Sequence, residues 1–549
     1  MQEKDIRNII TQPYEKFETW KPLLDYVFPD IQYEKNIVPV LDKSGKTVHI
    51  HQKGNTKLTD DKNIIILEAK VKADFKIAKN RVGFHELTAK YIDQANNHGI
   101  LIFYFSEDQD QKDYRLSFIC RESKFNEDGE VEEFKTNPKR YTYILGENES
   151  GQTAAKRLKE LASKKDTFKF ELKDVIDAFS VEKLNNEFFK KYKEQYEIFN
   201  QHLIDDTKFR YGIFDINKKE SKTDKVERAK NELPIRDFTK KLLGRLVFLH
   251  FLQKKSWMGV PAPANGKKVV WKNGKQNFLH QLFKDCKKQK QFHSKYLSEL
   301  FFNTLNNEER EDFLFLIDNE TPFADGKKVC VPYLNGGLFD DDFHNGKQID
   351  FPIQYFQNLF EFFDSYNFTI DENSPEDHDV GIDPEMLGHI FENLLEDNKD
   401  KGAYYTPKEV VHYMSQQSLI EYLKSKLKTD MQDIETFIKQ DKVTPYIKQN
   451  ASKIKDLLTE IKVCDPAIGS GAFPMGILKE IFQGLQKIHE IENPGQPFKA
   501  ADAKKHIIQN SIYGVDLEKG AVDIARCRHL GRSVRPDPRH DRSGGHPGL

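Results

Sequence analysis

The spacing of apolar residues divides the chain into an N-terminal part with strand-like runs and a longer part with helical periodicity. In the N-terminal part, short β-branched and aromatic runs bounded by turn residues predict strands at 37–41, 48–58, 64–71 and 99–105. The last two runs are almost continuously apolar, which is typical of strands buried on both faces. A helical pattern at 81–96 separates them, so we expect a compact α/β unit over residues 1–150.

Helical periodicity dominates the middle of the chain. Residues 151–235 are predicted to be mostly helical, with 182–200 as the strongest example. The charge-dense stretch 218–230 fits a solvated helix or linker. From Arg236 onward, apolar residues recur with the spacing of a buried helix, so we expect a mainly helical domain over 236–400.

A strand–turn–helix pattern lies near the C-terminal end. A β-prone run ends at Asp465, a turn containing Gly469 and Gly471 follows, and a helix-forming run begins at Met475. Glycines in such a turn let a ligand approach the backbone, and amides at the helix start can hold an anionic group. A Gly-rich turn is also common where tight packing alone requires it, so the turn by itself leaves both interpretations open.

A second strand is predicted at 512–515, and it is again followed by an acid, Asp516. In a parallel α/β sheet, a carboxylate at this position can accept hydrogen bonds from ribose hydroxyls. Between Phe473 and this acid, the segment Asn493-Pro494-Gly495-Gln496-Pro497 breaks the helical pattern. We therefore expect two helices and a loop before the second strand.

The segment Gly402-Ala403-Tyr404-Tyr405-Thr406-Pro407 precedes another predicted helix, and helix capping alone would explain it. Thr406 and Glu409 have the spacing of a capping box, and Pro407 suits the first helical position. Tyr405 and Val410 have the spacing of a hydrophobic staple.

Together, these three stretches resemble the cofactor-binding half of DNA methyltransferases that modify an exocyclic amino group, the adenine-specific class in particular. The pattern Asp-Pro-Ala-x-Gly-Ser-Gly-x-Phe at 465–473 is far more specific than a bare dinucleotide fingerprint. The resemblance implies that S-adenosyl-L-methionine (SAM) binds to Tyr405, Thr406, Asp465, Ala467, Gly469, Gly471, Phe473 and Asp516. A nicotinamide-dependent oxidoreductase is disfavoured because the Gly-x-Gly-x-x-Gly spacing is absent.

Glu68 and Lys70 lie in the strand predicted at 64–71, where period-2 geometry puts both on one face. The surrounding elements resemble the core of nucleases with a Pro-Asp…(Asp/Glu)-x-Lys site, in which acids hold a divalent metal such as Mg²⁺ near a lysine. That family has another Asp on the preceding strand, but 48–58 contains none. The substitutes are imperfectly spaced: Asp42, Asp60, Asp61 and Pro29-Asp30. An active nuclease with Glu68 as metal ligand, an inactive nuclease fold and a surface ion pair therefore stay open.

Composition favours a globular protein that could bind nucleic acid only through local basic surfaces. The 549 residues include 41 Phe, and the formal net charge is only −2, so any binding of DNA must use local basic faces. One basic patch, 284–295, is interleaved with Phe292 and Tyr296 and either follows phosphates or forms a solvated face. Five scattered cysteines and the lack of a long apolar run predict a cytoplasmic protein without a membrane span.

The composition changes abruptly after residue 526. Residues 527–549 are rich in Arg, His, Gly and Pro and contain no Lys or Asn, although the preceding chain is rich in both. The change indicates an aberrant, frameshifted tail, with a basic DNA-binding tail as the alternative. The amino-group DNA methyltransferases that this chain resembles orient the target amino group with an (Asn/Asp)-Pro-Pro-(Tyr/Phe) loop. This tetrapeptide does not occur in the sequence. We therefore expect the chain to be inactive in methyl transfer.

The predicted architecture is α/β and resembles the N-terminal portion of a large single-chain, type IIG-like restriction–modification enzyme. Its predicted parts are a nuclease-like α/β domain (1–150), a helical linker region (151–235), a helical connector (236–400) and the first half of a Rossmann-like SAM-dependent methyltransferase domain (401–526). The expected partner is double-stranded DNA. A non-catalytic DNA- or SAM-binding remnant is the alternative.

Overall fold

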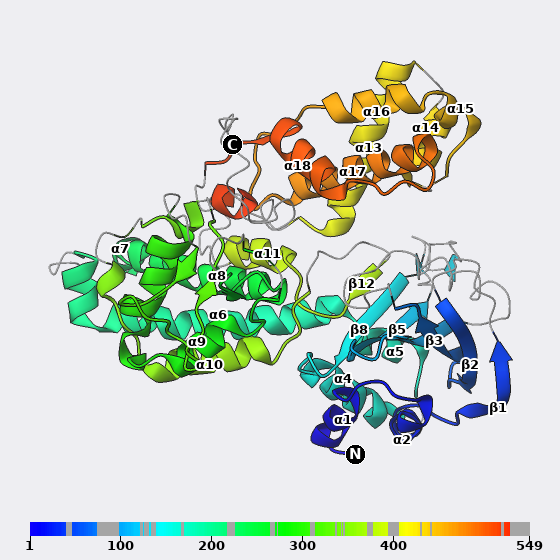
Figure 1. Ribbon diagram of the computed structural model, residues 1–549, viewed down its shortest axis with the longest axis horizontal. Coiled ribbons are helices and arrows are strands. Elements are labelled where there is room, and N and C mark those ends of the chain that lie inside the picture. Colours follow the sequence, from blue (N-terminus) through cyan, green and yellow to red (C-terminus); the bar gives the residue numbers. More distant parts are fainter. Residues whose placement is uncertain are drawn as a thin grey trace. The chain divides into compact units, whose positions relative to one another are not determined.

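The computed structural model contains two compact units (Figure 1). Unit 1 comprises Met1–Lys190 and Glu361–Asp383, and unit 2 comprises Lys191–Phe360 and Pro384–Leu549. The residues that the structure describes are 1–39, 47–73, 98–120, 124–125, 131–132, 139–165, 169–216, 225–263, 269–271, 273–307, 313–334, 337–341, 343, 346–369, 377–393, 406–428, 431–439, 442–517 and 521–526. Within these ranges, no helix is long and apolar enough to cross a bilayer.

Unit 1 is built on a seven-stranded mixed sheet with the strand order β1-β2-β3-β4-β5-β8-β12. Its strands are β1 (Gln32–Pro39), β2 (Thr47–Lys57), β3 (Asn63–Val71), β4 (Gly99–Ser106), β5 (Asp113–Cys120), β8 (Lys139–Gly146) and β12 (Asp377–Asp379). The β3–β4 and β8–β12 pairs are parallel, and the other neighbours are antiparallel. A separate ribbon pairs β6 (Lys124–Phe125) with β7 (Val131–Glu132). The strands predicted at 48–58, 64–71 and 99–105 are thus present.

The first strand differs from its prediction. β1 begins at Gln32, whereas the apolar run in the sequence predicts a start at residue 37. It is an edge strand whose side chains are almost all exposed, so it lacks the continuous apolar signal of a buried strand. Residues 40–41 and the helix predicted at 81–96 lie outside the described residues.

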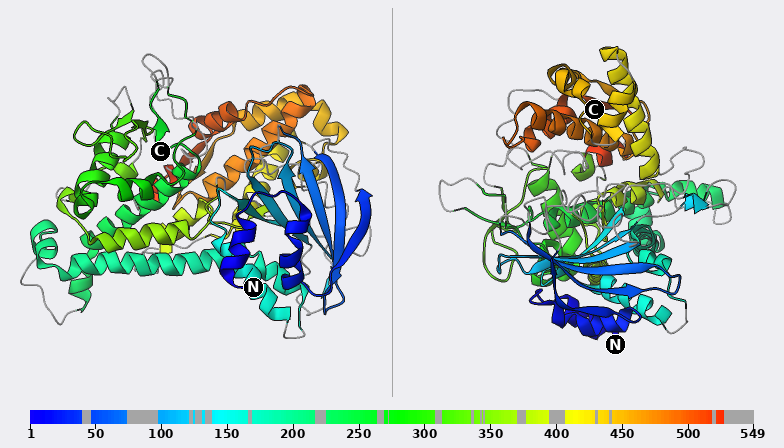
Figure 2. Two further views of the ribbon diagram at one scale, coloured as in Figure 1. Left: turned by 60° about the horizontal axis from the view of Figure 1, so that its bottom comes forward. Right: turned by 90° about the vertical axis from the view of Figure 1, so that its right-hand side faces the viewer.

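Helices and a short turn cover one face of the unit 1 sheet (Figure 2). They are α1 (Glu3–Ile10), η1 (Phe17–Thr19), α2 (Lys21–Val27), α4 (Gln152–Lys165) and α5 (Leu172–Ala178). Trp20 packs edge-on to Phe103 of β4, with ring centroids 4.8 Å apart. The opposite face carries a hydrophobic cluster that includes Ile65, Leu67 and Ile102. Burial on both faces explains why β3 and β4 are almost continuously apolar.

A segment from much later in the sequence completes unit 1. β12 pairs with β8 in parallel, from Asp377↔Arg140 to Asp379↔Thr142. The Asp379 carboxylate is 3% exposed and lies 2.9 Å from Nη1 of Arg115 on β5. Residues 361–383 therefore belong to the same compact unit as the N-terminal sheet. The four-domain division remains a prediction.

The first part of unit 2 is mainly helical. Its helices are α7 (Lys225–Asn231), α8 (Leu233–Lys254), α9 (Phe278–Asp285) and α11 (Glu385–Asn393), while α6 (Val181–Asp205) and α10 (Ile353–Asp364) run through the unit boundaries. Single turns of π- or 3-10 helix are η2 (Lys208–Ile213), η3 (Gln289–Gln291), η4 (Phe292–Leu297), η5 (Glu299–Leu305), η6 (Gly337–Phe339) and η7 (Gly346–Gln348). A small sheet has the order β10 (Leu314–Phe315), β11 (Val329–Cys330), β9 (Val260–Pro261). Every residue of α8 from Leu242 to Gln253 is buried, which agrees with the buried helix predicted from Arg236.

The second part of unit 2 contains the predicted strand–turn–helix. Its elements are α13 (Lys408–Leu427), α14 (Met431–Lys439), α15 (Pro445–Gln449), α16 (Ala451–Glu460), β13 (Val463–Asp465), α17 (Ala472–Glu492), α18 (Ala500–Asn510) and β14 (Ile512–Gly514). β13 and β14 form a two-stranded parallel sheet. The helices α17 and α18 are the two that the sequence predicts before the second strand. A hydrophobic cluster, including Leu419, Ile454 and Ile481, holds these helices together.

Candidate functional site

Two glycines with a left-handed backbone shape the turn that follows β13. Gly469 has φ 52° and Gly471 has φ 88°, a region that other residues rarely adopt. β13 and β14 run in parallel, so their carboxyl ends meet at the same edge of the sheet. The turn is held against the chain leaving β14, because the Ile468 amide donates to the Val515 carbonyl at 2.9 Å.

Asp516 contacts the backbone of this turn directly. The Gly469 amide donates a hydrogen bond of 2.8 Å to Oδ2 of Asp516. At the start of the turn, the Ala467 amide donates to Oδ1 of Asp465 at 3.0 Å. The structure therefore brings together Asp465, Gly469 and Asp516, three of the residues selected from the sequence.

Asp465 keeps one acceptor available. Its Oδ2 atom is buried and has no hydrogen-bond partner in the part of the chain that the structure describes. A buried polar atom without a partner costs about 1–3 kcal/mol, so such atoms normally meet water or a ligand. Oδ2 of Asp465 is thus a candidate acceptor for a hydroxyl or ammonium group of a ligand.

Tight packing accounts for part of the glycine content of this region. A Cβ atom at Gly471 would lie 3.1 Å from Cβ of Ala525, and one at Gly514 would lie 2.4 Å from Cδ1 of Ile468. Both interpretations of the Gly-rich turn therefore find support. Of the other predicted contacts, Ala467 is exposed and Phe473 is half-buried.

The start of α13 differs from the predicted capping box. The helix begins at Lys408 with Pro407 as its N-cap, and no side chain caps it. The Val410 and Val411 amides both donate to the Pro407 carbonyl at 3.1 Å, so the first helical turn opens one residue later than predicted. Thr406 then precedes the cap, where its hydroxyl does not serve the helix. It is half-buried, and Tyr405 lies outside the described residues.

The structure adds a buried polar group that the sequence does not indicate. Glu480 of α17 is 3% exposed, and its carboxylate accepts from Nε2 of Gln416 at 3.3 Å and lies 2.9 Å from Nδ1 of His412. These contacts join α13 to α17. The partners are separated by 64 and 68 residues, and no local pattern marks them as neighbours.

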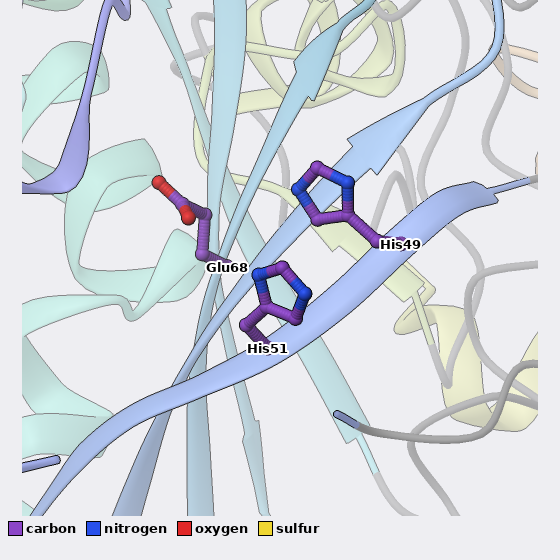
Figure 3. Close-up of side chains that lie close together, drawn as sticks. All are labelled: His49, His51 and Glu68. Atoms are coloured by element: carbon purple, nitrogen blue, oxygen red, sulfur yellow. The ribbon is translucent and has the colours of Figure 1, made fainter. Parts of the chain in front are cut away.

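In unit 1, two histidines of β2, His49 and His51, lie beside Glu68 of β3 (Figure 3). The strand register pairs His51 with Glu68 and His49 with Lys70. One ligand atom from each of His49, His51 and Glu68 lies within 4.8 Å of the other two. The imidazole rings are stacked, with centroids 4.3 Å apart and planes at 13°.

Burial sets the ionisation of the groups around Glu68. The Glu68 side chain is buried, and both histidines are half-buried. Partial burial lowers the pKa of His49 below its ordinary value, and the neighbouring His51 lowers it further. The pKa of Tyr14 is raised, mainly by burial and also by the negative charge of the nearby Glu68 carboxylate, so its hydroxyl keeps the proton.

Two groups already contact the Glu68 carboxylate. The Tyr14 hydroxyl donates to Oε1 at 2.8 Å, and Nζ of Lys53 lies 2.8 Å from Oε2. An ion pair was one of the three interpretations of Glu68 that the sequence left open. The observed pair has a buried carboxylate rather than the expected surface position.

The acid expected on the strand before β3 is not there, because β2 presents histidines at the corresponding positions. The proposed substitutes have other roles: Oδ2 of Asp60 accepts from the Leu172 amide at 3.2 Å, and Asp61 pairs with Lys57 at the surface. Asp42 lies outside the described residues. His49 and His51 are not among the site residues predicted from the sequence. Their His-x-His spacing, opposite Glu-x-Lys, was the signal available.

The basic patch at 284–295 does not offer the aromatic rings predicted from its sequence. Phe292 and Tyr296 are 1% and 4% exposed, so they belong to the core and cannot stack on nucleic-acid bases. Lysines of the patch line an open cavity of about 560 Å³, which is formed by Cys286, Lys287, Lys288, Gln289, Lys290, Gln291 and Ile353. Lys287 and Lys295 are paired with Glu320 and Asp318, respectively. The patch is therefore partly neutralised.

The chain is similar by sequence to a known protein and by structure to a solved restriction–modification enzyme. No family model matches the chain. The relative by sequence is a protein of Methanocaldococcus jannaschii named "Putative type II restriction enzyme and methyltransferase RM.MjaORFECS2P", which is 27% identical over 379 residues. The alignment covers 63% of this chain and 29% of the relative, so the chain corresponds to less than a third of the relative's length.

The structural comparison gives a weaker similarity. The type IIL restriction–modification enzyme MmeI, solved in complex with DNA, matches 54% of this chain and 33% of its own chain at 16% identity. The TM-score is 0.33, which does not establish a shared fold. By sequence, the chain is thus similar over nearly two thirds of its length to part of a protein named for restriction and methylation.

Proposed function

We propose that residues 401–526 form the SAM-binding half of an adenine-specific DNA methyltransferase within a restriction–modification enzyme that acts on double-stranded DNA. The hydrogen bond from the Gly469 amide to Asp516 carries this proposal, because it joins the glycine turn after β13 to the acid after β14. The similarity to the M. jannaschii protein supports the restriction–modification context. The choice of adenine rests on the resemblance of 465–473 and 404–407 to that class of methyltransferase.

The polar atoms of the turn suit SAM as a ligand. SAM would supply an activated methyl group. Asp465 offers a buried acceptor without a partner among the described residues, which can accept from an ammonium or hydroxyl group. Asp516 lies beside the same turn, and we assign it to the ribose hydroxyls. Tyr405 and Thr406 are assigned to the methionine end on the resemblance alone.

Calorimetric titration of SAM into the purified chain tests this assignment. Asp516→Asn keeps an oxygen for the Gly469 amide but removes the charge, whereas Asp516→Ala removes both. Loss of a hydrogen bond to a charged group costs about 1.5–3 kcal/mol, so we expect SAM affinity to fall about tenfold or more in both variants. Asp502→Ala, in the exposed first turn of α18, is the matched control. Unchanged affinity in Asp516→Ala would refute the ribose assignment.

A SAM-binding remnant without methyl-transfer activity is the alternative function. Incubation with labelled SAM and mixed genomic DNA distinguishes the two, since label recovered in adenine at enzymatic turnover would exclude the remnant.

A second candidate function is metal-dependent DNA cleavage by unit 1. It is favoured by Glu68 and Lys70 on one face of β3, beside two imidazoles. A metal ion at Glu68 could polarise a phosphoryl oxygen, and the lysine could neutralise developing charge. The test is nicking of supercoiled DNA with divalent metal ions. We expect Glu68→Ala and Lys70→Ala to abolish nicking and Glu34→Ala, on exposed β1, to retain it. Nicking that survives both active-site substitutions would exclude these residues.

A further inference from the structure

The face of unit 1 shown in Figure 3 carries a ligand set that differs from the oxygen-rich one expected from Glu-x-Lys nucleases. Adjacent strands β2 and β3 supply two imidazole nitrogens and one carboxylate oxygen, all within 4.8 Å of one another. The rigid strand register, His51↔Glu68, fixes the backbone positions of these side chains. A preformed arrangement of this kind limits the entropy lost when an ion binds.

We propose that His49, His51 and Glu68 bind a divalent transition-metal ion of the Zn²⁺ class, with one coordination position left open. Imidazole ligands favour Zn²⁺, Co²⁺, Ni²⁺ or Cu²⁺, whereas Mg²⁺ prefers oxygen ligands and retains several waters. Two histidines, one glutamate and an open position form one of the ligand sets found in catalytic zinc sites. Metal binding of this kind rests on the geometry of unit 1 and does not require that the unit cleave DNA.

The spacing of the ligands is compatible with such an ion after small side-chain rotations. Zinc–nitrogen bonds are about 2.0–2.1 Å long, so ligand atoms in a tetrahedral site lie about 3.3 Å apart. From separations within 4.8 Å, the atoms need to approach one another by no more than about 1.5 Å. Both histidines are half-buried, which leaves their rings room to turn and gives an ion access from solvent.

The surroundings of Glu68 fit a metal ligand held by neighbouring groups. The Tyr14 hydroxyl donates to Oε1 and so orients the carboxylate, as outer groups commonly do for metal ligands. Tyr14 is itself fixed by ring contacts with Phe103 and Phe105, whose ring centroids lie 5.6 and 4.8 Å from its own. The other oxygen, Oε2, would remain for the metal.

The ammonium group of Lys53 pairs with Oε2 of Glu68. Its Nζ lies 2.8 Å from this oxygen, and its side chain is 26% exposed and also lies over the Phe17 ring. A flexible, partly exposed ammonium group can withdraw toward solvent when a divalent ion arrives. Lys53 therefore competes with the metal, and its removal should tighten binding. A role for Lys53 in stability alone would not produce that result.

Titration of the metal-stripped chain, without a histidine tag, tests the site. We expect Co²⁺ to bind with the visible absorption of a four-coordinate ion, Zn²⁺ to displace it, and millimolar Mg²⁺ to leave it in place. The variants His49→Ala, His51→Ala and Glu68→Gln should each weaken Zn²⁺ binding about tenfold or more. Lys53→Met should strengthen it at least about threefold. His98→Ala, an exposed histidine of the same unit, should bind as the wild type does.

Several outcomes would overturn the assignment. Equal zinc stoichiometry and affinity in the wild type and in the His49→Ala/His51→Ala double variant would mean that the ion binds elsewhere. Displacement of Co²⁺ by Mg²⁺ would mean that the site prefers hard cations. Weaker binding in Lys53→Met would contradict competition at Oε2. Circular dichroism of each variant in EDTA separates loss of metal from loss of fold, and the two half-buried histidines can also be replaced by Gln.

Discussion

His293 is a buried group that resists protonation because of where its side chain lies. It is 1% exposed, and its Nδ1 lies 2.7 Å from the Ile349 carbonyl oxygen. The rings of Phe238 and Phe351 meet it edge-on, with centroids 5.7 and 5.9 Å away. Burial lowers the pKa of His293 from 6.5 to about 4. The folded protein therefore holds this imidazole in its neutral form near neutral pH.

A pH-dependent loss of stability follows for unit 2. As the pH falls, the unfolded chain takes up the proton first, near its pKa of 6.5, and the folded chain does so only near pH 4. Above pH 6.5 the imidazole is neutral in both states, so it does not reduce the free energy of unfolding. Between pH 6.5 and pH 4 only the unfolded chain is protonated, and the free energy of unfolding falls by about 3 kcal/mol. Chemical denaturation of the wild type and of His293→Leu at pH 7.5 and 4.5 checks this, with His489→Ala, at a half-buried histidine, as control. An identical pH dependence in the wild type and His293→Leu would contradict it.

Single residues could be selected from the sequence only where a local pattern marks them. Strand periodicity gives the shared face of Glu68 and Lys70, and the motif selects Asp465 and Asp516. Their surroundings depend on chain crossings that no local pattern encodes. The pairing of His51 with Glu68 is one example, and the lack of a partner for Oδ2 of Asp465 among the described residues is another.

At the scale of elements, α13 and α17 approach so closely that only glycine fits at one contact. A Cβ atom at Gly476 of α17 would lie 2.4 Å from Cγ1 of Val411 and 2.8 Å from Oγ of Ser415. Both neighbours on α13 are buried. The distance between these helices is therefore set by a residue that weakens its own helix.

Gly476→Ala tests this contact. Alanine favours the helix by about 1 kcal/mol, but overpacking costs about 1–3 kcal/mol, so we expect a net loss of stability. Val411→Ala in the same chain removes the clashing methyl and should restore part of the loss. Gly212→Ala is the control and should not destabilise, because no described residue has an atom within 4 Å of the added Cβ. Urea denaturation measures each change, and a more stable Gly476→Ala would disprove the close approach.

Long apolar elements could be predicted from the sequence, but their exposed ends could not. β3, β4, α8 and α17 carry continuous or periodic apolar signals, because packing fixes most of their side chains. β1 is exposed along an edge, so nothing apolar marks its start at Gln32. The first turn of α13 is set by the Pro407 carbonyl rather than by the side chain of Thr406, which the capping pattern had suggested.

At the scale of the whole chain, unit 1 depends on a contact between residues 264 positions apart. Arg115 and Asp379 form an ion pair with both side chains almost fully buried. Removing one partner of a buried pair leaves the other charge in a medium that cannot solvate it. We expect Asp379→Ala to destabilise unit 1 by about 3–5 kcal/mol.

Thermal denaturation followed by tyrosine and tryptophan fluorescence measures that loss. Asp61→Asn breaks an exposed ion pair with Lys57, keeps a residue that tolerates the φ of 59° at this position, and should leave the transition unchanged. Arg115→Met combined with Asp379→Leu replaces both charges and should recover much of the stability. If Asp379→Ala and Asp61→Asn behaved alike, β12 would not be anchored by this pair.

The return of the chain to the sheet could not be predicted from the sequence. β12 has only three residues, and their sequence, Asp-His-Asp, has neither the apolar content nor the length of a predictable strand. Its place beside β8 is fixed by the register Asp377↔Arg140 and by the buried Asp379. The contribution of residues 361–383 to unit 1 therefore emerges only in three dimensions.

This insertion has a consequence for biosynthesis. Some 230 residues separate the end of β8 from the start of β12, and a ribosome adding about 5–20 residues per second needs roughly 10–50 s to make them. Throughout that interval the nascent sheet ends at β8, with open backbone groups along its edge and Arg115 without the Asp379 carboxylate. An unpaired strand edge of this kind can pair with other chains and aggregate. We therefore expect a chaperone to bind the growing polypeptide until Asp379 has left the exit tunnel.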